Sequence, residues 1–294
     1  MQRVMKIFSF LGHDTLEREW TYAAQGSIWR ILFSTSGNVV GECRQHEQKT
    51  VSFFCLDERS GAVLWQDVRL DEPWWVGIEA VSRDVVLLHE FANPGVPEHK
   101  GIIALDVGSG SVLWRNTELT FWFAFNDSVY AYQPKFEKRI GFKMSMRTGA
   151  VEEEYGDALD DLYALRTLAL NEQQQEDFLF PEILEEDPGN AEIQTIIRKE
   201  TKGLMLHGQV EFIRRQSLVL MNYYTPGRSS TPESLVLENR FSIYDLDRQS
   251  KMFSEILATD AKAPTPDSFF IKGSLVYFIK QHNILTALRL TVKD

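Results

Sequence analysis

The chain has 294 residues, enough for one large all-β domain or two ordinary domains. Its 44% hydrophobic and 25% charged residues predict a substantial core and exclude a disordered chain. The net charge of −11 is concentrated between Glu152 and Asp187, where thirteen acidic residues accompany one base, Arg166, so the remainder is close to neutral. No basic footprint is left for a phosphate backbone, and we expect no nucleic-acid partner.

Neither a membrane span nor an export signal is expected. No segment approaches the roughly 20 apolar residues that a membrane helix needs, and Gly12-His13-Asp14 interrupts the apolar start of the chain. Cys43 and Cys55 fall on what we expect to be consecutive strands of one hairpin. A disulfide bridge between them remains an alternative, but buried free thiols in a reducing cytosol are the favoured interpretation. We therefore expect a cytoplasmic protein.

An internal repeat decides the expected fold. Three segments align without gaps: Phe8–Trp20, Phe53–Trp65 and Ile102–Trp114. In the last two, an aspartate precedes a glycine by four residues, and the tryptophan follows that glycine by four. Weaker copies end at Tyr155, which takes the place of the tryptophan, and at Phe253.

Each part of the motif has a physical role. The apolar run before the aspartate predicts a strand that is buried on both faces. The aspartate and the Ser or Thr beside the glycine bond the turn backbone, and the glycine supplies the positive φ of a tight turn. The tryptophan on the outer strand that follows is large enough to lie across the neighbouring sheet.

Further strands are expected between the motifs, and four short strands in each 40–50 residues are typical of a propeller blade. The sequence therefore predicts an all-β fold, a β-propeller of five or six four-stranded blades forming a single domain over residues 1–294. A β-sandwich is the alternative, but it would not require turn chemistry that repeats in phase. The N-terminal segment Phe8–Trp20 is expected to supply the outer strand of a blade completed by Ser268–Leu290, so both ends close one blade together.

The middle of the chain, residues 156–208, departs from the repeat as a short acidic and helical insertion. Leu162–Leu170 is interpreted as a strand. Asn190–Lys202 is predicted to be a helix, with Asn190 as its cap and three isoleucines on one face.

The motifs carry a family resemblance. Leu56–Trp65 and Leu105–Trp114 resemble the tryptophan-docking repeat of the PQQ-like (quinoprotein-type) β-propellers, which share their architecture with WD40 and YVTN-like propellers. The layout of the chain, including Pro73-Trp74-Trp75, is also similar to an uncharacterised bacterial family, a domain of unknown function. The resemblance implies a fold but no activity: the adjacent cysteines of many quinoprotein dehydrogenases are absent, and we expect no cofactor.

The sequence contains no recognisable catalytic, phosphate-binding or metalloprotease motif. His89, Glu90 and His99 flank one loop and could approach one another as a metal site, although solvent-exposed loop residues are the favoured interpretation. Trp74, Trp75 and Arg228 fall on loops expected at the same face of the propeller, where large aromatic and Arg side chains suit a binding surface. Packing of both tryptophans between blades is the alternative, and it is slightly favoured. These six residues are the candidate partner-binding set.

We therefore expect a non-enzymatic cytoplasmic propeller that binds a protein or peptide partner through its loop-rich face. The alternative is an enzyme of hydrolase or lyase type, or a small-ligand binder, that uses the central funnel of the propeller.

Overall fold

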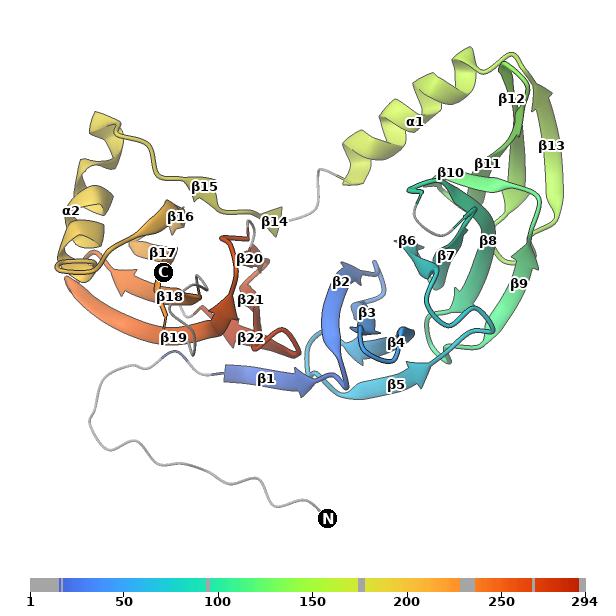
Figure 1. Ribbon diagram of the computed structural model, residues 1–294. Helices are drawn as coiled ribbons and strands as arrows, with labels where there is room; N and C mark the ends of the chain where they lie inside the picture. Colours follow the sequence, from blue (N-terminus) through green and yellow to red (C-terminus); the bar gives the residue numbers. More distant parts are fainter. Residues whose placement is uncertain are drawn as a thin grey trace. The chain divides into compact units, whose positions relative to one another are not determined.

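The computed structural model describes residues 16, 18–93, 96–173, 178–227, 236–265 and 268–290 (Figure 1). The described residues are mostly β: 58% of them lie in strands, and two short α-helices accompany these strands. The strands form several antiparallel sheets, and none of these closes into a barrel. The expected all-β class is thus confirmed. Arg228 and the first part of the Phe8–Trp20 segment lie outside the described residues.

The chain divides into two compact units. One contains Glu19–Phe178 and Ile279–Ala287, and the other contains Leu179–Phe278 with the flanking Met1–Arg18 and Leu288–Asp294. Each unit is described by itself.

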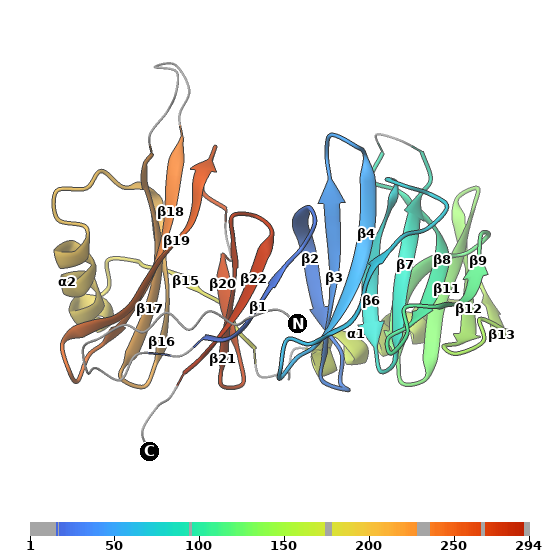
Figure 2. The same cartoon turned by 90° about the horizontal axis from the view of Figure 1, so that it is seen from below.

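The unit of Glu19–Phe178 is built from three four-stranded meanders, in which each strand pairs antiparallel with the next (Figures 1 and 2). The first consists of β2 (Ser27–Phe33), β3 (Asn38–Gln45), β4 (Thr50–Asp57) and β5 (Val63–Val68). The second consists of β6 (Val76–Ser82), β7 (Val85–Phe91), β8 (His99–Asp106) and β9 (Val112–Asn116). The third consists of β10 (Thr120–Phe125), β11 (Ser128–Lys135), β12 (Lys138–Ser145) and β13 (Val151–Gly156). A short parallel pairing of Thr120 with Gly101 joins the second and third meanders into one eight-stranded sheet.

The middle strands of the first two meanders are buried on both faces, as the continuous apolar runs predict. Val39 and Val40 on β3 and Leu87 and Leu88 on β7 have no exposed surface. Their side chains form cores between successive sheets: one joins the first meander to the second, and another joins the second to the third. Packing between sheets therefore holds this unit together.

The remaining strands form two more sheets. One has the order β15 (Glu182–Ile183), β16 (His207–Arg215), β17 (Leu218–Pro226), β18 (Leu237–Asp245) and β19 (Ser250–Ala261). The other has the order β1 (Arg18–Ala23), β22 (Ile284–Arg289), β21 (Leu275–Lys280), β20 (Phe269–Lys272) and β14 (Phe178–Leu179). The N-terminal strand is thus the neighbour of the last strand, and the expectation that the two ends complete one sheet is confirmed. The C-terminal part supplies the third strand, β22.

One backbone hydrogen bond recurs five times, once in each of the three meanders and once in each of the two remaining sheets. In these two sheets the strands are counted in chain order, from β16 to β19 and from β20 to β22. In each of the five cases, the residue that follows the third strand donates its N–H to the carbonyl of the residue that precedes the second strand. The donor–acceptor pairs are Glu58–Gly37 (2.9 Å), Val107–Asp84 (2.8 Å), Met146–Asp127 (3.0 Å), Leu246–Ser217 (2.8 Å) and Leu290–Ser274 (3.0 Å). The same hydrogen bond thus stands at the same position of each meander and of each of the two remaining sheets.

The three tryptophans of the aligned motifs occupy equivalent positions. Each indole N–H donates to the backbone carbonyl just after the third strand of the following sheet: Trp20 to Glu58 (2.9 Å), Trp65 to Val107 (2.6 Å) and Trp114 to Met146 (2.9 Å). Each ring also covers the turn glycine of that sheet, namely Gly61, Gly110 or Gly149. The three aligned tryptophans thus contact the turns of the following strands in the same way.

The interpretation of Leu162–Leu170 as a strand is wrong, because this segment lies within helix α1 (Asp160–Gln173). Leu162, Leu165 and Ala169 recur at helical spacing and pack on aromatic side chains of the third meander, including Phe123 and Tyr130. The helical conformation lets all three side chains contact the third meander from one face of α1.

The predicted helix over Asn190–Lys202 is confirmed as α2 (Ala191–Glu200), which follows a short 3₁₀ turn, Pro188–Asn190. Asn190 stands at the cap position but makes no side-chain cap hydrogen bond. The three isoleucines of α2 are buried against β16, β17 and β18. Of the helices that the structure describes, none is long and apolar enough to cross a membrane.

Cys43 and Cys55 are both buried and free. They lie on β3 and β4 as expected, but the strand register places Ser52 opposite Cys43 and Val40 opposite Cys55. The question of a bridge is thereby answered in favour of two thiols.

Candidate functional site

The hairpin of β7 and β8 brings His89 and His99 together. Phe91 on β7 pairs with His99 on β8, and alternation along β7 places His89 on the same face as Phe91. The imidazole rings of the two histidines are stacked, with centroids 3.5 Å apart and planes 7° from parallel. The Phe91 ring meets both of them edge-on, at 5.0 and 5.2 Å.

Glu79 on β6 completes this cluster, rather than the expected Glu90. Its Oε1 lies 2.5 Å from Nδ1 of His99 and 3.2 Å from Nδ1 of His89. Glu90 lies between His89 and Phe91 along β7, so its side chain leaves the opposite face of the strand. The structure brings the two histidines together beside Glu79 rather than Glu90, and the favoured interpretation of solvent-exposed loop residues does not hold for His89, which is buried on β7.

Irregular strand pairing directs these side chains. The β6–β7 register shifts between Ile78 and Ala80, which leaves Glu79 as the extra residue of a bulge. The β7–β8 register shifts between Leu88 and Glu90, at His89. Bulges re-aim side chains and are frequent beside functional sites.

The electrostatics of the cluster favour an ionised carboxylate. Burial alone would raise the pKa of Glu79, but its interactions with His89 and His99 outweigh burial and bring that pKa below its ordinary value. The His89 side chain is only 6% exposed. Nδ1 of His89 faces the Glu79 carboxylate at 3.2 Å, whereas its Nε2 has no hydrogen-bond partner among the described residues.

A second group of polar side chains surrounds Arg44 at the end of β3. Its Nε donates to Oε1 of Glu42 at 2.6 Å, and its two terminal nitrogens donate to the carbonyls of Trp74 (3.2 Å) and Val76 (2.9 Å). Both charged side chains are buried, and the second oxygen of Glu42 accepts the N–H of Ile78 at 3.0 Å. The ion pair thus ties the first meander to the start of β6.

Two tryptophans and a histidine gather over Arg44. The guanidinium carbon lies 5.6 Å from the Trp29 ring centroid and 5.0 Å from that of Trp74. His46 meets Trp29 at 6.3 Å and Trp74 at 5.4 Å, edge-on in both cases. Trp29 is 64% exposed although it is a large aromatic residue on a strand. We call Trp29, Arg44, His46 and Trp74 the tryptophan patch.

Trp74 and Trp75 are both half-buried. Oε1 of Glu72 accepts their two backbone N–H groups at 2.9 and 2.8 Å, which fixes the connection between β5 and β6. Trp74 contacts Arg44 within the tryptophan patch, whereas the ring of Trp75 lies 5.7 Å from the ring of Phe91. The two adjacent indoles therefore have different neighbours: Trp74 belongs to the tryptophan patch, and Trp75 contacts the cluster of Phe91 with the two histidines.

Sequence reasoning missed Glu79, Glu42, Arg44 and Trp29. Glu79 stands as a lone acid within an apolar strand, V-G-I-E-A-V-S, and Glu42 interrupts a similar run in β3. A charge inside a buried strand needs a partner, and that rule would have marked both positions. Nothing comparable marked Trp29.

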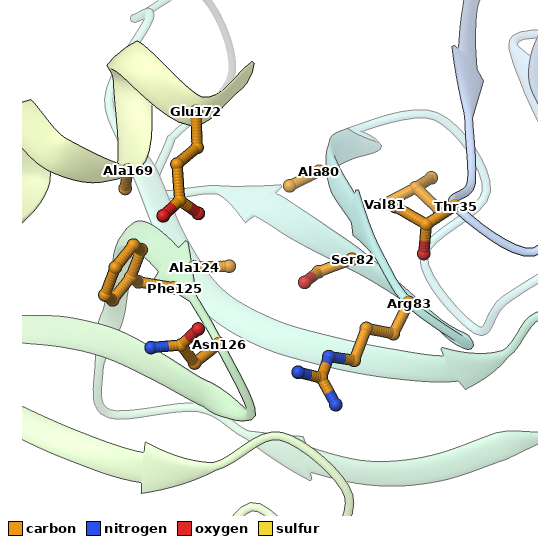
Figure 3. Close-up of a pocket in the computed structure, with 10 residues that line it drawn as sticks. All are labelled: Thr35, Ala80, Val81, Ser82, Arg83, Ala124, Phe125, Asn126, Ala169 and Glu172. Carbon is orange, nitrogen blue, oxygen red and sulfur yellow. The ribbon is translucent and has the colours of Figure 1, made fainter. Parts of the chain in front are cut away.

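A pocket of about 360 Å³ lies elsewhere in the same unit, where the ends of β6 and β10 meet α1. Figure 3 shows Glu172 of α1 on one side of it and Ser82, Arg83 and Asn126 on the other. Arg83 also forms an ion pair with Asp127 at 2.7 Å. The pocket thus combines both signs of charge with apolar walls from Val81 and Phe125.

Residues 33–114 match the family model of a domain of unknown function, DUF4905. The matched residues include Glu79, His89, His99 and most of the tryptophan patch. No curated protein matches the chain.

Two solved structures are similar to the chain at 9% identity. The uncharacterized protein lmo1340 from Listeria monocytogenes EGD-e aligns with a TM-score of 0.32 over 90% of this chain and 97% of that one. A eukaryotic initiation factor aligns with a TM-score of 0.26 over 87% of this chain and 83% of that one.

Proposed function

We propose that the chain is a five-bladed propeller of the PQQ-like type and that it acts as a non-enzymatic binding protein. The same backbone hydrogen bond in the three meanders and the two remaining sheets supports the blade count. Three indoles docked on turn glycines support the kind of repeat. The two helices pack on existing sheets, which favours insertions over a sixth blade.

The partner is a protein or peptide that docks on the tryptophan patch. The observation that carries this proposal is the exposure of Trp29, 64%, above a buried Arg44 whose three nitrogens each donate a hydrogen bond. An exposed indole on a rigid base offers apolar area without the entropy cost of ordering it on binding. Tryptophan and arginine are also the residues most enriched among binding hot spots. The binding face is therefore the strand end that carries the β3–β4 hairpin and the β5–β6 connection.

A cytoplasmic location accords with this role. Cys43 and Cys55 are buried, free and on neighbouring strands, as thiols in a reducing compartment are. The net charge of −11 disfavours nucleic acid and favours a partner without strong negative charge.

The experiment compares Trp29→Ala with a matched control, Leu64→Ala. Both residues are exposed, 64% and 45%, and Leu64 lies on the outer strand β5. A partner identified by affinity purification and mass spectrometry is titrated against each purified variant by calorimetry. We expect Trp29→Ala to weaken binding by about 30-fold, a hot-spot loss of about 2 kcal/mol. Leu64→Ala should leave affinity within about twofold. Equal affinity for the wild type and Trp29→Ala would place the interface elsewhere.

The pocket of Figure 3 favours a second candidate function, the binding of a small ligand. Arg83, Ser82 and Asn126 offer hydrogen-bond donors that suit a small carboxylate. Ligand-observed NMR with small dicarboxylates tests this function, and Arg83→Gln should abolish any signal. Binding that survives Arg83→Gln would remove the pocket from consideration.

A further inference from the structure

We propose that Glu79, His89 and His99 form a binding site for a divalent transition-metal ion of the zinc class. One carboxylate and two imidazoles are a ligand set that zinc uses where three protein groups leave a fourth position open. The ligand atoms of the three residues all lie within 4.8 Å of one another. This inference does not rest on partner binding at the tryptophan patch.

The buried imidazole of His89 is the second, independent observation. Its side chain is only 6% exposed, Nδ1 lies 3.2 Å from Oε1 of Glu79, and Nε2 has no hydrogen-bond partner among the described residues. Burying an unpaired polar group costs free energy, so such groups in native proteins call for a partner. A metal ion bound to one nitrogen supplies that partner.

The surrounding backbone holds the three ligands close together. They come from three consecutive strands of one sheet, β6, β7 and β8, and two of them lie where the strand register shifts. A Cβ at Gly77, which pairs with His89, would stand only 3.1 Å from the His89 ring. The glycine thus leaves space for the imidazole at this position.

The rings must reorient for both to bind one ion. Stacked rings have parallel planes, so their in-plane lone pairs do not converge on a common point. His89 is enclosed, whereas the His99 side chain is 33% exposed and has room to turn about its Cβ–Cγ bond. His99 is therefore the ligand that swings, while Glu79 and His89 provide the fixed part of the site.

The test is metal binding by the full chain after removal of bound ions with a chelator. Zinc chloride is titrated by calorimetry, and Co²⁺ is titrated by its visible absorption, which reports coordination by nitrogen and oxygen. We expect one ion per chain with a Kd tighter than about 10 μM. Zinc should also raise the melting temperature, because it binds the folded state.

Two variants and a control assign the site. Glu79→Gln keeps the shape of the side chain, and His99→Gln alters a partly exposed residue, so each tests the site without a large change to the core. Each should weaken zinc binding at least about tenfold, since even loss of an outer-shell partner has an effect of that size. His282→Gln, a change to an exposed histidine of the same unit that lies outside the tryptophan patch, should leave the affinity within about twofold.

Three results would overturn the proposal. The first is the absence of zinc and cobalt uptake by the wild type. The second is uptake that Glu79→Gln and His99→Gln both leave unchanged, and the third is an equal loss of zinc affinity in His282→Gln. Partner binding at the tryptophan patch is measured with Trp29→Ala, so failure of one proposal is distinguishable from failure of the other.

Discussion

The indole of Trp65 lies over the α-carbon of Gly110, so closely that a Cβ on this glycine would stand 2.9 Å from Cδ2 of the ring. Gly110 also has a φ of +70°, a conformation that side chains with a Cβ rarely adopt. The glycine therefore serves both the turn between β8 and β9 and the docking of the preceding sheet.

Gly110→Ala should lower the free energy of unfolding by more than about 2 kcal/mol, because strain in the turn and displacement of the indole add together. Gly37→Ala is the matched control: its φ is +79°, but nothing lies within 4 Å of the added Cβ. That change should cost only about 1 kcal/mol of backbone strain. Urea denaturation measures both, and equal costs would show that the indole contact contributes little.

Trp65 itself should be sensitive to truncation. Trp65→Ala should cost about 3–5 kcal/mol, as large aromatic-to-alanine changes in cores do. Trp65→Phe keeps most of the apolar contact but leaves the Val107 carbonyl without its 2.6 Å bond, which should cost about 1–3 kcal/mol. A cost below about 1 kcal/mol for Trp65→Ala in thermal or urea unfolding would contradict the docking role.

The buried ion pair of Glu42 and Arg44 should be more costly to break than to replace. Glu42→Ala leaves the guanidinium buried without its counter-charge, and we expect a loss of about 3–5 kcal/mol. The double variant Glu42→Gln with Arg44→Met removes both charges and should be less destabilised than Glu42→Ala. If the double variant has a lower free energy of unfolding than Glu42→Ala, the hydrogen bonds of this site contribute more to stability than its charge pairing.

The two thiols should be unreactive in the folded protein. Burial raises the pKa of Cys43 above its ordinary value, and burial together with the charge of Asp57 raises that of Cys55 to about 12. Only the thiolate reacts with disulfide reagents, so labelling at pH 8 should be slow until denaturant is added. Rapid labelling of both residues in the native protein would contradict the burial of this hairpin.

Asp57 should make stability depend on acidity. Hydrogen bonds from the Ser60 hydroxyl and N–H lower the pKa of Asp57. The stabilisation from a lowered pKa is present above the unfolded value of about 3.9 and is lost as pH falls through the folded value. The difference in free energy of unfolding between the wild type and Asp57→Asn should therefore be present at pH 7 and shrink below about pH 4. A difference that is constant with pH would exclude this linkage.

What the sequence by itself determined is local. The spacing of Asp57, Gly61 and Trp65 predicts a turn, a positive φ and an outer strand, because the bonds of this turn join residues at most five positions apart. The same spacing at Gly110 predicts an equivalent contact, and docking is the arrangement that buries each indole. Because this spacing recurs along the chain, these local rules were enough to predict an all-β fold.

What only the tertiary structure decided depends on register and on neighbouring sheets. Glu79 reaches His89 and His99 because the β6 pairing shifts at that residue, and a one-residue shift exchanges the faces of a strand. Leu162–Leu170 is helical in the structure, where Leu162, Leu165 and Ala169 pack against aromatic side chains of the third meander. Trp29 joins Trp74 through Arg44, which spans two sheets. Such contacts join residues far apart in the chain, so no local spacing encodes them.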